Sequence, residues 1–567
     1  MKEINYLDFT EEEIENGVKD EFGAVYSADG KRLLKLENED LKEYSIKEGT
    51  VYICHGAFEY SNLKKINIPD GVTHIGNEAF RRTKIKEIIL PDSVQFIGKG
   101  AFDGGDLKKI NIPKGITSIE KDTFNFCTSL KEINIPDSVE RIEEDAFYNC
   151  NSIKTINIPN VKFIGEDAFD DCNSLEHINN YESLTYIGDR TFAHCNNLLE
   201  FHISPKITHI GENPFYDCWS LKITSESSRF VVIDNMLIDK KKKILIAYCG
   251  KEKEVNIPDS VTHIGDSAFF HCYSIEKINI PDSVKTIGDE AFSWCNSLKE
   301  INFSNSLTSI GECAFHNCKE LKSIYIPDSV VTIGKCAFDD CTSLKEIHLS
   351  DSITTIRDYA FKNCESLKTI NFPNSVKVIG KGSFNNCCKL KEIELPDSII
   401  YIGKGCFQYC ESLKKVNIPR SMTFIEDEVF DECNALKKVT IPESVTGISS
   451  NAFCYCYALS ELFLPDSLTY IGENAFNNCR SLREVRFPDS LESIQKSAFY
   501  ECCSLENIHL PDSITSLGYQ VFAYNYNLKK INIPAGLTSI PSGFCSECHA
   551  LESVEIPENI SHIGEDA

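Results

Sequence analysis

Cysteine is the residue type with the greatest capacity for chemistry in this chain, because it can act as a nucleophile, a metal ligand or half of a disulfide. The 567 residues include 26 cysteines. Most of them stand three residues after a phenylalanine, as Cys127, Cys150 and Cys172 do. Cysteines in this register are expected to face the interior of a repeated unit, where they fill the core as small apolar side chains. Stacked parallel side chains point the same way, so the column predicts free, buried thiols rather than disulfides.

Two further pairs of cysteines need separate interpretation. Cys545 and Cys548 form a lone Cys-x-x-Cys, without the second pair that a structural zinc site requires or the βαβ unit of a thioredoxin. We interpret that spacing as coincidental. Cys313 and Cys336 hold equivalent places in successive repeats, and thiols lying side by side there leave a redox-sensitive pair as an open alternative.

No other pattern in the sequence indicates catalysis. The 13 histidines are scattered, no glycine-rich phosphate loop follows a strand pattern, and the recurrent carboxylates of Pro-Asp-Ser are typical of turns. We therefore predict a protein that is not an enzyme, with no catalytic residues, no cofactor and no metal site. A thiol redox or metal-binding role is the third of our functional interpretations.

The elements that position these side chains follow from one repeated pattern. In one copy the recurring positions are Leu130, Ile133, Ile135, Pro136, Val139, Ile142, Ala146, Phe147 and Cys150. Ile133 and Ile135 share one face of a short first strand, because side chains alternate with a period of two. Pro136 ends that strand, since it has no amide hydrogen, and residues 139–142 form a second short strand. Where glycine follows the last isoleucine, as in Ile264-Gly265, we expect a corner with positive φ.

The length of the array comes from a phenylalanine that returns every 22 or 23 residues from Phe58 to Phe544, with one longer gap between Phe215 and Phe269. One such coil cannot bury its apolar residues unless another coil lies on each side. The repeat therefore predicts a solenoid in which the copies stack and their strands pair in parallel.

The pattern Leu-x-x-Ile-x-Ile-Pro-Asp-Ser-Val-x-x-Ile-Gly-x-x-Ala-Phe-x-x-Cys resembles the leucine-rich repeats of the BspA-like family, found in bacterial surface proteins and some protists. The resemblance covers about nine tenths of the chain. It implies a right-handed arc with a parallel sheet on the concave side and short extended or 3-10 segments on the convex side. It also implies binding roles such as adhesion, and the family has no shared catalytic residues to carry over.

We expect four parts along the chain. Residues 1–50 form an amino-terminal cap with a β-hairpin around Asp29-Gly30, and residues 51–222 form a first leucine-rich-repeat array. Residues 223–254 form an aberrant coil or β-hairpin insertion, for which a flexible hinge is the alternative. Residues 255–567 form a second array that is truncated within its last repeat.

The two ends of the sequence lead to further expectations. No stretch is apolar enough for a membrane span, and the first residues lead into the acidic segment 11–13 rather than into an apolar signal core. As written, the chain is expected in the cytoplasm; the alternative is a secreted or cell-surface protein whose leader was removed. Because the last repeat stops before its phenylalanine, we expect a truncated chain or an end-to-end contact that covers the last coil.

The outward position between the two inward isoleucines of the first strand is usually asparagine, as at Asn256, Asn279 and Asn302, and stacked amides predict a structural ladder. We expect the first strands to form the concave sheet. The asparagine column breaks in two places, and arginine and aromatic residues there are types enriched in interfaces. The hypothetical binding residues at these breaks, for which drift of an unselected surface is the alternative, are Tyr325, His348, Thr440, Phe463, Arg486 and His509.

Charge adds one argument about partners. Lysine often follows the leading leucine of the first strand, whereas acidic residues crowd the turns, and the formal net charge is −27. This total opposes nucleic acid at long range, so we expect no nucleic-acid binding and no membrane insertion. Our prediction is a scaffold that binds a protein partner, with microbial adhesion or interaction as its setting. The alternative is a carbohydrate- or matrix-binding surface adhesin.

Overall fold

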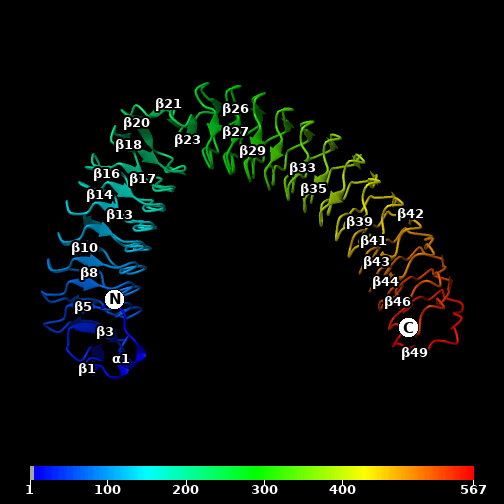
Figure 1. Cartoon of the computed structure of the whole chain (residues 1–567), viewed down its shortest axis with the longest axis horizontal. Helices are drawn as coiled ribbons and strands as arrows, with labels where there is room; N and C mark the ends of the chain where they lie inside the picture. Colours follow the sequence, from blue (N-terminus) through cyan, green and yellow to red (C-terminus); the bar gives the residue numbers. More distant parts are fainter. Residues whose placement is uncertain (1–5) are drawn as a thin grey trace, which may run out of the picture. The chain divides into compact units, whose positions relative to one another are not determined.

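The computed structural model describes residues 6–567. Among these residues there is one helix, α1 (Glu11–Glu15), which starts at a capping box between Thr10 and Glu13. The other described residues lie in strands, turns, bends and irregular segments. The chain forms two compact units, Met1–Gly250 with Gly265–Ala268 (unit 1) and Lys251–Ile264 with Phe269–Ala567 (unit 2), and each unit is a row of stacked coils (Figure 1).

Most coils carry a first strand at the Ile-x-Ile segment and a second strand ending at the isoleucine before the corner. In unit 1 the first strands are β4 (Glu43–Ser45), β6 (Lys65–Asn67), β8 (Glu87–Ile88), β10 (Lys109–Asn111), β12 (Glu132–Asn134), β14 (Thr155–Asn157), β16 (His177–Asn179), β18 (Glu200–Ile203) and β20 (Lys222–Ser225). The second strands of unit 1 are β5 (Tyr52–Ile53), β7 (His74–Ile75), β9 (Phe96–Ile97), β11 (Ser118–Ile119), β13 (Arg141–Ile142), β15 (Phe163–Ile164), β17 (Tyr186–Ile187) and β19 (His209–Ile210).

Unit 2 repeats both rows. Its first strands are β24 (Glu254–Asn256), β26 (Lys277–Asn279), β28 (Glu300–Asn302), β30 (Ser323–Tyr325), β32 (Glu346–His348), β34 (Thr369–Asn371), β36 (Glu392–Ile393), β38 (Lys415–Val416), β40 (Lys438–Thr440), β42 (Glu461–Phe463), β45 (Asn507–Ile508) and β47 (Lys530–Ile531). Its second strands are β25 (His263–Ile264), β27 (Thr286–Ile287), β29 (Ser309–Ile310), β31 (Thr332–Ile333), β33 (Thr355–Ile356), β35 (Val378–Ile379), β37 (Tyr401–Ile402), β39 (Phe424–Ile425), β41 (Gly447–Ile448), β43 (Tyr470–Ile471), β44 (Ser493–Ile494), β46 (Ser516–Leu517), β48 (Ser539–Ile540) and β49 (His562–Ile563).

Two antiparallel groups interrupt this regularity in unit 1. The first is β1 (Val18–Lys19), β2 (Ala24–Tyr26) and β3 (Arg32–Leu36), in which β2 and β3 pair around Asp29-Gly30. β3 also pairs in parallel with β5, so this group continues the row of second strands. The other is β21 (Phe230–Ile233), β22 (Met236–Asp239) and β23 (Ile244–Tyr248), which form a three-stranded meander.

Stacking in register buries the apolar columns, which confirms the predicted solenoid. In the coil of residues 130–150, Ile133, Ile135 and Ile142 are 7%, 5% and 0% exposed. Ile110 lies opposite Ile133 in the parallel pair β10–β12, so each isoleucine packs against the equivalent isoleucine of the next coil. Each fully buried isoleucine contributes about 2 kcal/mol relative to its exposure in an isolated coil.

The phenylalanine column is a stack of rings. Phe147 and Phe169 have centroids 5.2 Å apart and ring planes at 5°, and both are fully buried. In these coils the phenylalanine amide donates to the alanine carbonyl of the next coil, as Phe147 does to Ala168. Phe522 donates instead to Phe544, and these two rings meet edge to face at 85°. Phe544 therefore occupies the alanine position, and our assignment of it to the phenylalanine column is wrong.

The glycine after the last isoleucine has a different role from the one expected. Gly165 has no positive φ. A Cβ on Gly165 would lie 2.6 Å from the amide nitrogen of Glu144 in the preceding coil. Glycine is thus required by the close approach of successive coils, which the second-strand side of the solenoid needs.

The positive φ values lie on either side of the Ala-Phe segment. Asp145 and Asn149, for example, have φ of 57° and 58°, and equivalent residues repeat this geometry in most coils. These two left-handed corners reverse the chain without a 3-10 helix, and the described residues contain none. Asparagine and aspartate tolerate this region better than most side chains.

The two rows of strands differ in continuity. In unit 2 the second strands from β25 to β37 form one uninterrupted parallel ladder, whereas the first strands separate into sheets of two to four. Figure 1 draws β27, β29, β33 and β35 toward the inner side of the bend of unit 2, and β26 and β42 toward its outer side. The inner parallel sheet therefore consists of second strands, whereas the repeat pattern leads us to expect first strands there. The glycines that let second strands approach closely account for the difference.

Candidate binding surfaces

The asparagine column of the first strands is built into the scaffold. Asn279 donates to Asn256 at 2.7 Å, and Asn302 donates to Asn279 at 2.9 Å, so their amides form a ladder. In another coil the amide of Asn417 donates to the carbonyl of Leu395 and accepts from its backbone nitrogen. These asparagines hold neighbouring coils together, so the coils without asparagine at this position lack these side-chain bonds.

The hypothetical binding residues are all exposed on the first-strand row of unit 2. Tyr325 and His348 lie opposite each other in β30 and β32, with ring centroids 5.8 Å apart. Thr440 and Phe463 lie opposite each other in β40 and β42, and Phe463 is 51% exposed. The row lies on the outer side of the bend of unit 2 rather than on the concave side where the repeat pattern leads us to expect it (Figure 1).

Two pockets open beside these residues. Arg486 and His509 line a pocket of about 690 Å³, and the segment around Arg486 is not paired as a strand. Thr440 lines a second pocket, of about 870 Å³. Four residues in successive coils, Thr440, Phe463, Arg486 and His509, define what we call the first-strand patch.

The larger pocket combines apolar and basic side chains. Val416, Ile418, Ile441 and Pro442 contribute apolar surface. The ammonium group of Lys438 lies 4.9 Å from the centroid of the Phe463 ring, so a cation covers one ring face. The basic residues that line this pocket are Lys414, Lys415, Arg420 and Lys438.

A second row of candidate residues was missed from the sequence. Outward side chains of the second strands in unit 1 stack along the ladder: Arg141 covers Phe163 at 3.8 Å, Phe163 and Tyr186 are 4.6 Å apart, and Tyr186 and His209 are 4.3 Å apart. The signal was an aromatic residue immediately before Ile-Gly in successive repeats. Because these rings stack face to face, they present edges rather than faces to a ligand. We interpret this row as reinforcement of the sheet.

The cysteine column has a structural role. The thiol of Cys150 donates to the carbonyl of Phe124 in the preceding coil at 3.1 Å, and the same bond recurs in most coils of both units. Burial raises the pKa of Cys127 and of Cys172 to about 12, so these thiols are poor nucleophiles.

The remaining cysteines are also free. Burial, with the neighbouring Cys336 as a further cause, raises the pKa of Cys313 to about 12. Cys545 stands at the phenylalanine position of its coil, and a hydrogen bond with Cys548 raises the pKa of Cys545 and lowers that of Cys548.

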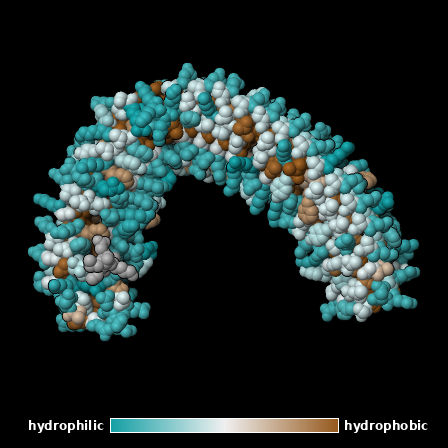
Figure 2. Space-filling model, viewed as in Figure 1, coloured by the Kyte–Doolittle hydropathy of each residue, from teal (hydrophilic) through white to brown (hydrophobic). Residues whose placement is uncertain are grey.

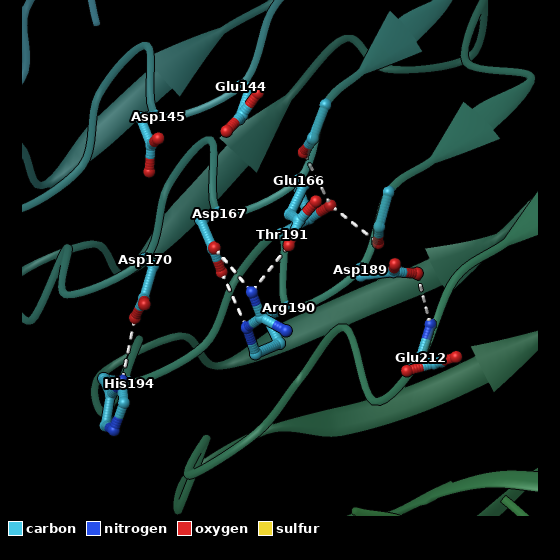
Figure 3. Close-up of polar contacts among 12 residues, drawn as sticks. Glu144, Asp145, Glu166, Asp167, Asp170, Asp189, Arg190, Thr191, His194 and Glu212 are labelled. Carbon is cyan, nitrogen blue, oxygen red and sulfur yellow. Dashed lines mark hydrogen bonds and ion pairs between the residues drawn. The ribbon is translucent and has the colours of Figure 1, made fainter. Parts of the chain in front are cut away.

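The left-handed corners carry clusters of charged side chains. Figure 3 shows Arg190 reaching Asp167 in the preceding coil, with Nη2 to Oδ2 at 2.8 Å, and His194 reaching Asp170, with Nδ1 to Oδ1 at 2.8 Å. Burial and the neighbouring Asp122 and Asp167 raise the pKa of Asp145 to about 6. Two such clusters place histidine and aspartate atoms close enough to hold a metal ion: Asp170, Asp171 and His194, and His316, Asp339 and Asp340.

On the face drawn in Figure 2, hydrophilic side chains predominate and hydrophobic ones form separate spots. None of the described residues belongs to a helix with the length and apolar character needed to cross a bilayer.

Comparison with known proteins gives a consistent result. The family model described as BspA type leucine rich repeat region (6 copies) matches the chain over residues 36–153, 117–245, 245–345, 332–460 and 447–567. The chain is similar to a leucine rich cell surface protein from Faecalibacterium prausnitzii A2-165, at 31% identity over 64% of this chain and 94% of that chain, with a TM-score of 0.51. It is also similar to a leucine-rich repeat protein from Bacteroides ovatus ATCC 8483, at 30% identity over 62% of this chain and 83% of that chain, with a TM-score of 0.44. No curated protein matched the chain.

Proposed function

Because the chain belongs to the BspA-type leucine-rich-repeat family, we propose that it is a non-enzymatic scaffold that binds a protein partner through the first-strand patch of unit 2. The observation that carries this proposal is the half-exposed ring of Phe463 in a row that also opens into two pockets. Half of the Phe463 side chain stays exposed although Lys438 of the preceding coil covers one ring face, and arginine and aromatic residues anchor many protein interfaces.

The charge around the larger pocket favours a particular partner. Four basic residues and one acidic residue, Glu443, line this pocket, although the chain as a whole carries a formal charge of −27. The other pocket is mixed, because Asp466, Glu484 and Asp489 line it together with Arg486. An acidic protein surface with an apolar side chain that enters the larger pocket would match both features. Binding of this kind should weaken as salt is raised, because exposed charges are screened.

The setting that the family supports is the microbial cell surface. The similar protein from Faecalibacterium prausnitzii is described as a cell surface protein, and adhesion to other proteins is a role that such a location allows. A carbohydrate or matrix ligand is the alternative.

The test is a binding screen with the whole chain. Immobilised protein would be exposed to a panel of purified extracellular proteins and to a glycan array, and each hit would be measured again with the double variant Phe463→Ala, Arg486→Glu. We expect an acidic protein to bind, and the variant to lose at least about tenfold in affinity.

The matched control is Ile89→Ala, Lys86→Glu, which makes the same kinds of change on the first-strand row of unit 1, where Ile89 is 83% exposed. The control should bind as the unchanged protein does. Equal affinity of the patch variant, or hits confined to glycans, would contradict the proposal.

A further inference from the structure

His316 and Asp339 hold the same repeat position in successive coils of unit 2, immediately after Phe315 and Phe338. Backbone hydrogen bonds fix these coils against each other, since Phe315 donates to Ala337 and Asn317 donates to Asp339. The two side chains must therefore lie side by side. Asp340 follows in a left-handed corner with φ of 59° and completes the group.

The polar atoms of this group face one another without satisfying one another. His316 Nδ1 lies 3.8 Å from Asp339 Oδ2, which is too long for a hydrogen bond. His316 Nδ1 is a buried atom with no hydrogen-bond partner. Asp339 is only 8% exposed, and the hydrogen bond that its carboxylate accepts from the side chain of Asn363 is long, at 3.4 Å.

A buried carboxylate of this kind requires a counter-charge. Among the described residues, no lysine or arginine lies within ion-pair distance of Asp339. A cation placed between the facing atoms would supply the charge and give His316 Nδ1 the partner that it lacks.

The spacing suits a small divalent cation. One ligand atom from each of His316, Asp339 and Asp340 lies within 4.8 Å of the others. Metal–nitrogen and metal–oxygen bonds of about 2.0–2.2 Å place two ligands of one ion roughly 3–4 Å apart. The other ring nitrogen, His316 Nε2, is 2.8 Å from the side-chain amide of Asn317, which can turn to accept its proton and so orient the ring.

A similar set of residues in unit 1 lacks the unsatisfied atoms. Asp170 and Asp171 also follow a phenylalanine, and His194 lies beside them, but His194 Nδ1 already bonds to Asp170 at 2.8 Å (Figure 3). There the imidazole and the carboxylate satisfy each other. This set is therefore a natural comparison for the one in unit 2.

We propose that His316, Asp339 and Asp340 form a binding site for one divalent transition-metal cation of the Zn²⁺ class, with water in the remaining positions. One imidazole and two carboxylates are ligands that such ions accept. The ion would link two adjacent coils of unit 2 and stabilise the corner between them.

The test is calorimetric titration of the full chain with ZnCl₂ after chelator treatment. It would use a Cys313→Ser, Cys336→Ser background, because those half-buried thiols lie in the same coils. We expect one saturable site per chain, an increased melting temperature with Zn²⁺, and at least about tenfold weaker binding in Asp339→Asn. Asp339→Asn keeps the shape of the side chain, and circular dichroism would verify that it folds.

Asp170→Asn is the matched control in unit 1, and it should leave the affinity unchanged. The proposal is overturned if no saturable binding occurs below about 100 μM, if Asp339→Asn binds as tightly as the background protein, or if Asp170→Asn is the variant that loses the site.

Discussion

The thiol of Cys150 donates a hydrogen bond to the carbonyl oxygen of Phe124, 3.1 Å away in the preceding coil. That oxygen also accepts from the backbone nitrogen of Cys127 in its own coil, at 3.0 Å. Each phenylalanine carbonyl of this kind is thereby satisfied twice, once within a coil and once between coils. The cysteine column is thus a row of hydrogen-bond donors that ties the coils together.

Removing one such thiol should destabilise the protein measurably. Cys150→Ala loses the bond to Phe124 and leaves a small cavity, so we expect the free energy of unfolding to fall by about 1–2 kcal/mol in urea titrations. Cys388→Ala is the control, because that half-buried thiol bonds only within its own coil, to Asn386. Equal losses in the two variants would argue against a special role for the column.

Thiol reactivity should divide the cysteines into two classes. Since burial raises the pKa of Cys127 and Cys172 to about 12, these thiols should not react with a disulfide reagent at about pH 8 in the folded protein. Half-buried thiols such as Cys388 and Cys503 should react slowly, and all 26 should react in denaturant. Rapid reaction of all of them without denaturant would mean that the column is not buried.

The close approach of coils on the second-strand side can be tested at one glycine. Gly165→Ala would place a Cβ 2.6 Å from the amide nitrogen of Glu144, so the coils must separate locally, and we expect a loss of about 2 kcal/mol or more in the free energy of unfolding. At Gly105 an added Cβ would meet its neighbours at an ordinary 3.5 Å. Gly105→Ala should therefore be nearly neutral, and a neutral Gly165→Ala would refute the steric argument.

A buried carboxylate in unit 2 should make stability depend on pH. Burial raises the pKa of Asp431 to about 6, whereas aspartate in an unfolded chain titrates at about 3.9. The folded state therefore binds more protons between these values, and this group's contribution to stability falls as the pH rises from about 4 to 6.

The amide of Asp431→Asn cannot ionise, so this variant does not lose stability at this position as the pH rises. At pH 7 we expect the variant to gain about 1 kcal/mol in the free energy of unfolding, after allowance for partial solvent screening, and to gain nothing at about pH 4. Denaturant titrations at both pH values check this, with the exposed Asp259→Asn as control. A gain of the same size at both pH values would show that ionisation of Asp431 is not the cause.

The periodic positions of the fold could be read from the sequence because their burial depends only on spacing. Ile133, Phe147 and Cys150 repeat at fixed intervals, and stacking in register buries every copy in the same way. The sequence does not show that Phe544 takes the alanine position of its coil, because Phe544 and Cys545 are adjacent and either side chain could fill the phenylalanine position in the core. The backbone bond from Phe522 decides between them.

The left-handed corners and the polar clusters were harder to predict. Asparagine and aspartate are frequent at these positions, but Arg190 and Tyr409 also adopt positive φ, so residue type alone is a weak signal there. His316 and Asp339 are distant in sequence and become neighbours only through the coil register. Comparing the same repeat position in successive copies, rather than counting scattered histidines, would have brought them together.

The left-handed corners also offer positions at which the thermal stability of the protein can be raised. Each non-glycine residue held there, such as Asp145 or Asn149, gives up about 1 kcal/mol relative to a relaxed backbone. Glycine accepts this geometry with little strain, as Gly382 already does with φ of 57°. Substituting glycine at one corner after another should therefore raise the melting temperature in small steps. The side chains of both rows of strands, which recognition would use, stay unchanged.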